Sequence, residues 1–275
     1  MIRAIVLYLF LLLCTASCAH KQPPAEGLLR DNPDVVSFPS SESNLFNSKL
    51  ILTGRLQKPA GTGKFPAVVL LHGCGGVQPK RDHRWAERLV SWGYVTLQVD
   101  SFKPRGISSV CTLGGKESSD MLARRVTDAY DAQQFLASLP FVDKKRIAIM
   151  GWSNGGSTTL NALYQKRDDP FHAAIAMYPS CRKSLADLNA PLLILIGEKD
   201  DWTPAERCVS VIPSGKSSFE VALQAYPNAY HAFDSIGKPR EVMGSQGSHH
   251  LEYNPAAERD SIDRVKNFLV RYLLQ

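Results

Sequence analysis

The sequence predicts an α/β fold in which helices cover both faces of one mostly parallel sheet. Short apolar runs alternate with helix-like stretches from about residue 66 to the end of the sequence. The first of these runs, Pro-Ala-Val-Val-Leu-Leu at 66–71, is apolar throughout, as expected for a strand covered on both faces. The sequence has no internal repeat, and its composition does not change abruptly along the globular part, so we expect residues 35–275 to form a single domain.

The strands are predicted from apolar runs bounded by turn residues. Residues 35–38 and 50–57 are expected to pair as a hairpin at the edge of the sheet. The later strands are expected at residues 66–71, 94–99, 147–150, 173–177, 191–196 and 219–224. Ligands of such sheets bind at the carboxyl ends of the strands, so a functional site is expected at that edge.

Helices are predicted where apolar residues recur three or four positions apart. They are marked by Trp85, Leu89 and Trp92, by Leu122, Val126, Ala129 and Leu136, by the residues from about Asn154, and by Ala257, Ile262, Val265, Leu269 and Leu273. Asn254-Pro255 is a good cap and first-turn pair for the last of them. The segments 101–119 and 237–254 are expected to shape a pocket or to act as a lid.

Residues 1–19 have the pattern of an export signal. Arg3 makes the start positive, residues 4–13 are apolar, and residues 15–19 are small. The apolar stretch is too short to remain as a membrane-spanning helix, although an ordinary transmembrane anchor is the alternative. Residues 20–34 are rich in proline and polar side chains and are expected to form a tether.

Two routes of processing fit this signal. Thr15-Ala-Ser-Cys18 resembles a bacterial lipobox, so Cys18 would carry a lipid and tether the protein to a membrane. Ser17-Cys-Ala19 also fits ordinary cleavage before His20. Either route predicts an exported protein, periplasmic or lipid-anchored to the bacterial envelope.

The remaining cysteines predict disulfides. An even number of cysteines in an exported chain favours pairing, with free buried thiols as the alternative. Cys181 and Cys208 flank one predicted strand, so we expect the pair Cys181–Cys208, and with it Cys74–Cys111.

The charge pattern argues against other classes of function. The net charge is +6, but no Lys/Arg cluster is interleaved with aromatic residues, so no nucleic-acid partner is expected. No His/Asp/Glu cluster has the spacing of metal ligands, and no cofactor is expected.

The central motif is Gly151-Trp-Ser-Asn-Gly-Gly156, which follows a buried strand and precedes a helix. The pattern Gly-x-Ser-x-Gly in this context is typical of a nucleophile elbow. Ser153 is then the nucleophile, and the backbone N–H of Asn154 faces a developing oxyanion. The alternative is a glycine-rich turn in an unrelated α/β protein.

A serine nucleophile needs a base and an acid, which follow it in the order acid, then histidine. Asp200 follows a predicted strand in Gly-Glu-Lys-Asp and is the predicted acid, with Asp201 as its rival. His231, in the loop after the last strand, is the predicted base. His249 and His250 lie in a polar segment that we interpret as a solvated loop.

A second oxyanion donor is expected from the turn His72-Gly-Cys-Gly-Gly76. Its glycines allow backbone N–H groups to approach a carbonyl oxygen, and the N–H of Cys74 is the predicted donor. The alternative, Cys74 as a thiol nucleophile, lacks the context of an elbow.

These motifs together resemble the dienelactone hydrolase family. The matching pieces are His72–Gly76, Asp100–Gly106, Gly151–Gly156, Gly197–Pro204 and Tyr226–Asp234. The resemblance implies the α/β-hydrolase fold, a three-layer α/β/α arrangement, and hydrolysis of a carboxylic ester or lactone without a cofactor. It also implies that Arg105 binds a substrate carboxylate, as a family arginine does; a structural surface arginine is the alternative.

The founding enzymes of that family have a cysteine at the elbow, whereas this chain has Ser153. We therefore expect a serine hydrolase that forms an acyl-enzyme with Ser153, His231 and Asp200. The alternatives are a peptidase or amidase on the same scaffold and a non-catalytic envelope lipoprotein that binds a ligand. A non-catalytic protein would be expected to lack a member of the triad.

Overall fold

A computed structural model of the chain describes residues 34–43, 49–213 and 217–274, and an eight-stranded sheet dominates it. The strand order is β1-β2-β4-β3-β5-β6-β7-β8. The strands are β1 (Asp34–Ser43), β2 (Lys49–Gln57), β3 (Phe65–Leu71), β4 (Val95–Asp100), β5 (Val142–Trp152), β6 (Ala174–Met177), β7 (Leu192–Gly197) and β8 (Val221–Tyr226). Strands β3 to β8 pair in parallel, whereas β1–β2 and β2–β4 pair antiparallel at the edge.

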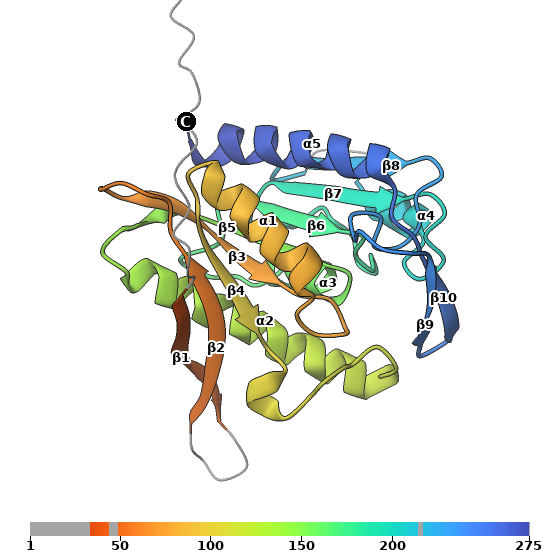
Figure 1. The fold of residues 1–275 in the computed structure, drawn as a ribbon, viewed down its shortest axis with the longest axis horizontal. Coiled ribbons are helices and arrows are strands. Elements are labelled where there is room, and N and C mark those ends of the chain that lie inside the picture. The colour runs from red at the N-terminus through yellow and green to blue at the C-terminus, as the bar shows by residue number, and fades with distance from the viewer. Residues whose placement is uncertain (1–33, 44–48, 214–216, 275) are drawn as a thin grey trace, which may run out of the picture.

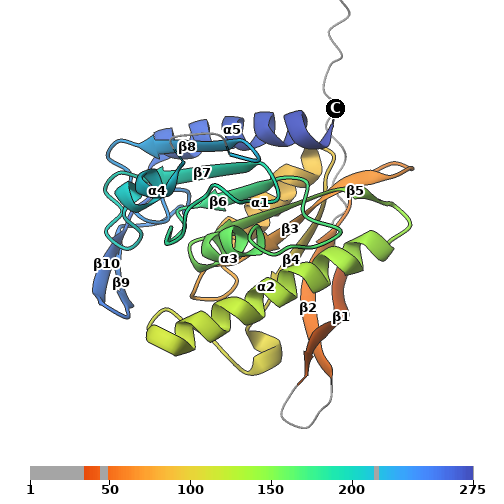
Figure 2. The ribbon, with the colours of Figure 1, turned by 180° about the vertical axis from the view of Figure 1, so that it is seen from behind.

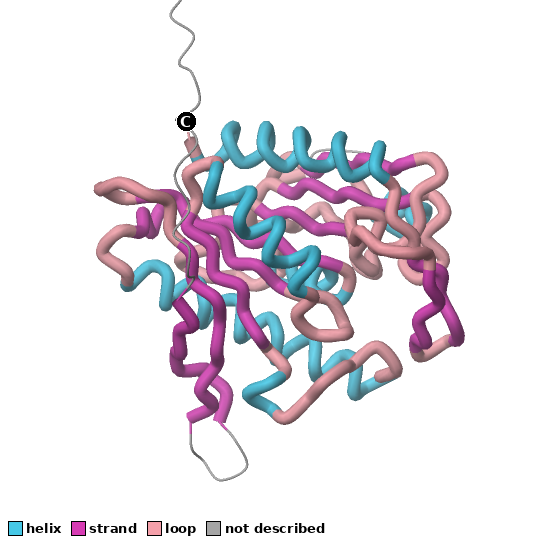
Figure 3. Tube along the Cα trace, in the orientation of Figure 1, coloured by secondary structure: helices cyan, strands magenta, loops and turns pink. Residues whose placement is uncertain are grey.

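Helices cover both faces of this sheet. They are α1 (Pro79–Ser91), α2 (Gly115–Ser138), α3 (Asn154–Ala162), α4 (Ala205–Val211) and α5 (Pro255–Leu273), with a short 3-10 turn at Lys103–Arg105. Helices α1 and α5 lie on the face seen in Figure 1, and α2 and α3 lie on the opposite face, seen in Figure 2. The same three layers can be followed in the trace of Figure 3. The predicted α/β/α fold class is confirmed.

The core lies between these layers because the central strands are apolar on both sides. Residues 67–71 of β3 and all of β7 are buried, as the unbroken apolar runs predicted. The buried indole rings of Trp85 in α1 and Trp152 in β5 lie with their centroids 6.2 Å apart, so a helix and the central strand share this packing.

Some boundaries differ from the sequence-based expectation. Helix α2 begins at Gly115, so the predicted loop 101–119 ends in a helical turn. Segment 237–254 contains a separate antiparallel hairpin of β9 (Arg240–Gly244) and β10 (Gly247–Leu251). The hairpin lacks the alternation of apolar and polar residues that identifies a strand, which explains why the sequence predicted a solvated loop there.

Both predicted disulfides are present, Cys74–Cys111 and Cys181–Cys208. The predicted signal, its Cys18 lipobox and the tether lie outside the described residues, except for Asp34, which begins β1. Within the described ranges, none of the helices combines the length and the apolar character that crossing a membrane would require.

Candidate active site

Ser153 occupies a sharp turn between β5 and α3. Its φ of 54° and ψ of −114° lie outside the regions that L-residues usually adopt, which is the strain expected of a nucleophile elbow. The N–H of Ser153 donates to the carbonyl of Met177 at 2.9 Å, which ties the turn to β6. The side chain of Ser153 is thereby fixed at the carboxyl end of the central strand.

Glycine is required on both sides of this serine. A Cβ at Gly151 would lie 2.2 Å from the carbonyl oxygen of Gly155. A Cβ at Gly155 would lie 2.1 Å from the carbonyl oxygen of Leu71 in β3. Both distances are far below van der Waals contact, so the close approach of β3, β5 and α3 explains the motif.

The structure brings the three predicted triad residues together. His231 Nε2 lies 2.9 Å from Ser153 Oγ, and His231 Nδ1 lies 2.7 Å from Asp200 Oδ2. A carboxylate only accepts hydrogen bonds, so Nδ1 carries the proton and Nε2 is free to accept from the serine hydroxyl. Such a relay can remove the serine proton during nucleophilic attack.

Asp200 is buried and held in place by the turn that follows β7. Its Oδ1 accepts the N–H groups of Trp202 and Thr203 at 3.0 and 2.7 Å, and Oδ2 accepts the Thr203 hydroxyl at 2.8 Å. Burial alone would raise the pKa of Asp200, but His231 and the hydrogen bonds from Thr203 hold that pKa below its ordinary value. Asp200 therefore stays ionised beside the imidazole.

Asp201, the rival acid, lies elsewhere. Its side chain is about half exposed and its Oδ1 lies 3.5 Å from Nδ1 of His249. Its Oδ2 accepts the N–H of His250 at 3.3 Å, which joins the turn after β7 to the β9–β10 hairpin. The geometry therefore favours Asp200 over Asp201 as the partner of His231.

Two aromatic rings enclose the His231 imidazole. Tyr178 meets it edge-on with centroids 4.8 Å apart, and Trp202 lies 5.1 Å away in a tilted orientation. The Tyr178 hydroxyl donates to buried Asp234 at 2.7 Å, and Trp85 and Trp152 donate to the same carboxylate. The sequence analysis did not identify Asp234, because its three partners come from separate parts of the chain.

The predicted oxyanion residues both line the cavity above Ser153. Asn154 is the first residue of α3, so its N–H has no partner within the helix. An ideal Cβ at Gly73, which precedes Cys74, would lie 3.7 Å from the Ser153 Cβ, so the His-Gly-Cys turn packs directly against the elbow. The amides of Cys74 and Asn154 are therefore candidate donors to an oxyanion.

His72 is buried and holds this turn as a neutral ring. Its Nδ1 donates to the carbonyl of Gly73 at 2.8 Å, and its Nε2 accepts the N–H of Ser101 at 3.3 Å. A ring that donates at one nitrogen and accepts at the other carries no charge. In agreement, burial and the nearby Arg125 lower the pKa of His72 well below its ordinary value.

Arg125, in α2, joins the two halves of the candidate oxyanion site. Its Nη2 donates to the carbonyl of His72 at 2.7 Å, and its Nη1 donates to the side chain of Asn154. The guanidinium is completely buried and lies over the Phe102 ring at 5.1 Å. Burial lowers the pKa of Arg125 to about 10, so it remains charged at neutral pH. The sequence analysis missed it, because no motif surrounds it.

Arg105 does not join the site, contrary to what the resemblance implied. Its guanidinium is paired with Asp128, at 2.8 Å, and with Glu42, and its side chain is 6% exposed. It does not line the cavity that contains Ser153. The ion pairs neutralise the charge that a substrate carboxylate would need, so the geometry favours the structural role that was the alternative for Arg105.

A cavity of about 680 Å³ lies over the triad. Segment 101–119 contributes Val110, Cys111 and Leu113 to its wall, and the β9–β10 hairpin contributes Ser245 and His249. Both segments that were expected to shape a pocket therefore line it. Among the described residues, no group of three or more His, Cys, Asp or Glu side chains is arranged to hold a metal ion.

Residues 52–273 match the model of the dienelactone hydrolase family. The chain belongs to the dienelactone hydrolase family. A putative dienelactone hydrolase from Klebsiella pneumoniae has the same fold, with a TM-score of 0.66 and 21% identity over 87% of this chain and 100% of that chain. The family membership agrees with the elbow, the turn at His72 and the order of the candidate triad.

The relatives of this chain include both esterases and peptidases. The chain is 28% identical to the cutinase est2 of Thermobifida alba over 182 residues. This aligned region is 64% of this chain and 56% of that protein. It is 39% identical to a probable dipeptidyl-aminopeptidase B of Grosmannia clavigera over 94 residues. This aligned region is 32% of this chain and only 9% of that protein. The chain is thus a hydrolase-family member that spans about half or less of these relatives.

Proposed function

We propose that this protein is a serine hydrolase of carboxylic esters or lactones that works through an acyl-enzyme. The observation that carries the proposal is the continuous hydrogen-bonded relay from Asp200 through His231 to Ser153 at the floor of an open cavity. The strained elbow and the two residues that line the cavity as candidate amide donors, Cys74 and Asn154, support the same chemistry. The likeness to a cutinase supports an ester as the substrate.

In the proposed mechanism, Ser153 Oγ attacks the ester carbonyl while His231 Nε2 takes the hydroxyl proton. The N–H groups of Asn154 and Cys74 stabilise the oxyanion of the tetrahedral intermediate. His231 then gives its proton to the departing alcohol as the carbon–oxygen bond breaks, which leaves the acyl-enzyme. Water, activated by His231, releases the acid and restores Ser153. Throughout, Asp200 orients the imidazole and stabilises its cationic form.

A peptidase is the second candidate, because several relatives carry that description. One observation disfavours an aminopeptidase in particular. Within the part of the chain that the structure describes, no Asp or Glu lines the cavity, so these residues offer no carboxylate partner to the ammonium group of a peptide N-terminus. Esters and lactones impose no such requirement.

The deciding experiment compares nitrophenyl esters of increasing acyl length, dienelactone and short peptide nitroanilides, with the wild-type protein and Ser153→Ala. We expect hydrolysis of esters by the wild type, loss of several orders of magnitude in Ser153→Ala, and labelling of the wild type by a fluorophosphonate. Faster cleavage of the nitroanilides would favour the peptidase. A folded protein with no ester turnover and no labelling would favour the binding lipoprotein.

We also propose that residues 35–275 form one exported domain, with the N-terminal residues as signal and tether. The disulfides support an oxidising compartment. Mass spectrometry of the mature N-terminus tests the route of processing: a diacylated Cys18 would indicate the lipoprotein, and a free His20 would indicate ordinary cleavage. An intact Met1 would contradict both.

A further inference from the structure

A buried carboxylate, that of Asp234, lies behind the candidate triad and accepts hydrogen bonds from three aromatic side chains. Its Oδ2 accepts the indole N–H groups of Trp85 and Trp152 at 2.8 and 2.9 Å, and its Oδ1 accepts the hydroxyl of Tyr178 at 2.7 Å. Asp234 is 0% exposed. A buried carboxylate needs such donors to stay ionised, and a fully paired cluster of this kind fixes the side chains that take part in it.

Buried Arg81 extends this cluster with a positive charge. Its Nη1 donates to the hydroxyl oxygen of Tyr178 at 3.4 Å, and its Nε donates to Asp82 at 2.7 Å. Burial and the charge of Asp234 raise the pKa of Tyr178 well above its ordinary value, so the phenol keeps its proton. The Tyr178 hydroxyl therefore accepts from Arg81 and donates to Asp234.

Asp234 belongs to the same turn as the candidate base, His231. The N–H of Ser235 closes this turn by donating to the carbonyl of Ala232 at 2.9 Å, and Ala232 has a positive φ of 57°. The backbone carbonyl of Asp234 accepts a guanidinium N–H of Arg84 at 2.6 Å. Asp234 is thus anchored through both its backbone and its side chain, within the turn that carries the base.

Two of the three aromatic donors adjoin the candidate reacting groups. Trp152 immediately precedes Ser153 at the end of β5. The ring of Tyr178 meets the His231 imidazole edge-on with centroids 4.8 Å apart, and the φ of 38° at Tyr178 is unusual for a residue with a side chain. The third donor, Trp85, lies in α1 and packs on Trp152 instead.

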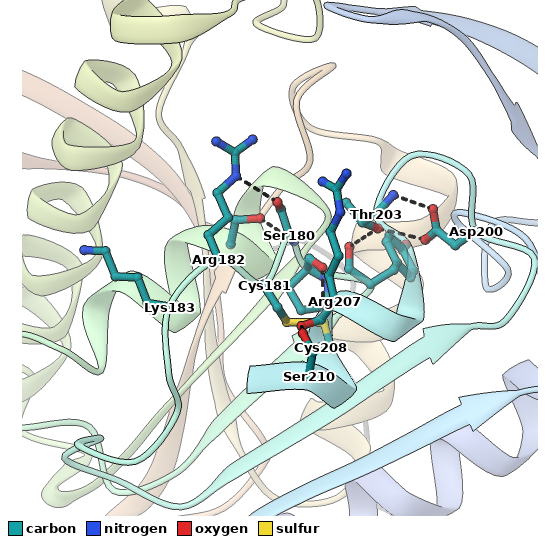
Figure 4. The surroundings of a disulfide bond; sticks show 12 residues. Ser180, Cys181, Arg182, Lys183, Asp200, Thr203, Arg207, Cys208 and Ser210 are labelled. Atoms are coloured by element: carbon teal, nitrogen blue, oxygen red, sulfur yellow. Dashed lines mark hydrogen bonds between the residues drawn. A yellow bond between two sulfur atoms is a disulfide. The ribbon is translucent and has the colours of Figure 1, made fainter. Parts of the chain in front are cut away.

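Tyr178 is also connected to the candidate acid. The hydroxyl of Thr203 lies 3.1 Å from the carbonyl oxygen of Tyr178 and 2.8 Å from Asp200 Oδ2. Figure 4 shows Thr203 and Asp200 side by side in the surroundings of the Cys181–Cys208 disulfide. The cluster around Asp234 therefore reaches all three members of the candidate triad.

We propose that Asp234 is a positioning residue of the proposed hydrolase. Through Trp152 it holds the elbow, and through Tyr178 it holds the imidazole of His231. It does not line the cavity, so it acts only through these neighbours. Proton transfer needs Ser153 Oγ and His231 Nε2 at hydrogen-bond distance, here 2.9 Å. A displacement of about 1 Å can lower the rate about a hundredfold, so both links are expected to matter for kcat.

The test removes one donor at a time. Trp152→Phe, Tyr178→Phe and Trp85→Phe each delete one hydrogen bond to Asp234 and keep an aromatic ring. Trp85→Phe is the matched control for Trp152→Phe, because both lose an indole N–H to the same oxygen but only Trp152 adjoins the elbow. On a neutral nitrophenyl ester, Trp152→Phe and Tyr178→Phe should lower kcat by about tenfold to a hundredfold with KM within about twofold. Trp85→Phe should keep kcat within about threefold of wild type.

Two further measurements separate positioning from a loss of stability. The rate of fluorophosphonate labelling of Ser153 should fall together with kcat, because labelling uses the same nucleophile and base. The NMR signal of the His231 Nδ1 proton, which is bonded to Asp200, should shift or broaden in Tyr178→Phe and stay unchanged in Trp85→Phe. Urea unfolding should show a similar loss of stability in the two tryptophan variants. Asp234→Asn should combine the losses of kcat, and if it does not fold, the three phenylalanine variants carry the test.

The outcomes separate this proposal from the hydrolase proposal on which it rests. If Trp85→Phe loses as much kcat as Trp152→Phe, Asp234 only stabilises the fold and the positioning role is overturned. The role is also overturned if either Trp152→Phe or Tyr178→Phe keeps the wild-type kcat. In these cases the wild type still hydrolyses esters, so the hydrolase stands. A folded wild type with neither ester turnover nor labelling would overturn the hydrolase itself.

Discussion

His249 stacks on Trp202 with ring centroids 4.8 Å apart and planes only 9° from parallel. This contact docks the β9–β10 hairpin against the turn that holds Asp200, and Trp202 in turn contacts His231. A Cβ at Gly244 of the hairpin would lie 2.8 Å from the His249 ring, so the stacked ring fits closely beneath β9. The hairpin is therefore part of the wall of the site.

Removal of this stacking should change the binding of long substrates more than the rate of the chemical step. We expect His249→Ala to loosen the hairpin and to alter KM for long-chain nitrophenyl esters by about threefold to tenfold, as one lost aromatic contact allows. The kcat for nitrophenyl acetate should change little, because the relay is intact. His250→Ala, which keeps the stacking, is the control. Equal effects of both variants would argue against a role for the stacked ring.

The choice between the two adjacent aspartates gives a sharper test. Asp200→Asn should lower kcat by about 10⁴, because the amide favours the wrong imidazole tautomer. Asp201→Asn should retain most of the activity, since the recorded partners of the Asp201 side chain among the described residues are His249 and His250 of the hairpin. The test is the kcat for ester hydrolysis by the two purified variants. A larger loss in Asp201→Asn than in Asp200→Asn would identify Asp201 as the acid.

The two buried arginines of α2 and its neighbouring turn are expected to differ in role. Arg125→Met should lower kcat by about tenfold to a hundredfold with a smaller change in KM, somewhat less than loss of an oxyanion donor itself. Arg125→Lys, which restores a donor, should recover part of the loss. These rates are measured on a neutral nitrophenyl ester.

Arg105→Gln is the control for that experiment. It leaves Asp128 buried without its cation, so we expect a loss of about 3 kcal/mol in the free energy of unfolding with little change in kcat. Urea denaturation and ester hydrolysis on the same preparations give both quantities. A large loss of kcat in Arg105→Gln, comparable with that in Arg125→Met, would show that both arginines act only by holding the fold together.

The lowered pKa of Asp200 predicts how stability depends on pH. A carboxylate whose pKa is lower in the folded state stabilises the protein above its unfolded pKa, and this contribution is lost as pH falls through the folded pKa. The stability advantage of the wild type over Asp200→Asn should therefore be constant near neutral pH and decrease below the ordinary aspartate value of 3.8. Melting temperatures from pH 7 to pH 2.5 measure it. An advantage that grows in acid would contradict the assignment.

The disulfides should contribute separately to stability. They close loops with sequence separations of 37 and 27 residues, for which chain entropy gives about 3–4 kcal/mol each. We expect a loss of this order in the free energy of unfolding when either pair is replaced by serine. Urea unfolding measures it for the double variants Cys74→Ser with Cys111→Ser and Cys181→Ser with Cys208→Ser. Because Cys74 belongs to the candidate oxyanion turn, only the first pair should also lower kcat on a neutral ester.

Much of the site was predictable because it is encoded locally. Gly151 and Gly155 are needed wherever a serine sits on so tight a bend, so the motif and its flanking strand predict the elbow. Asp200 and His231 follow strands in the order that the fold requires, and the alternation of apolar runs predicts the layers. The pair Cys181–Cys208 was predicted from its position on either side of an expected strand, and Cys74–Cys111 was then the remaining pair.

What the sequence could not decide depends on groups far apart along the chain. A substrate-binding Arg105 and a structural Arg105 have the same local sequence, and only the packing of Glu42 and Asp128 around it decides between them. Arg125 gains its place at the elbow from α2 lying across His72 and Asn154. His249 becomes buried through stacking on Trp202. The sequence determined the fold class and the candidate reacting groups, because backbone strain and strand order leave local signatures. The tertiary structure decided which charges are neutralised and which side chains line the cavity, because charge pairing and burial depend on distances between remote segments.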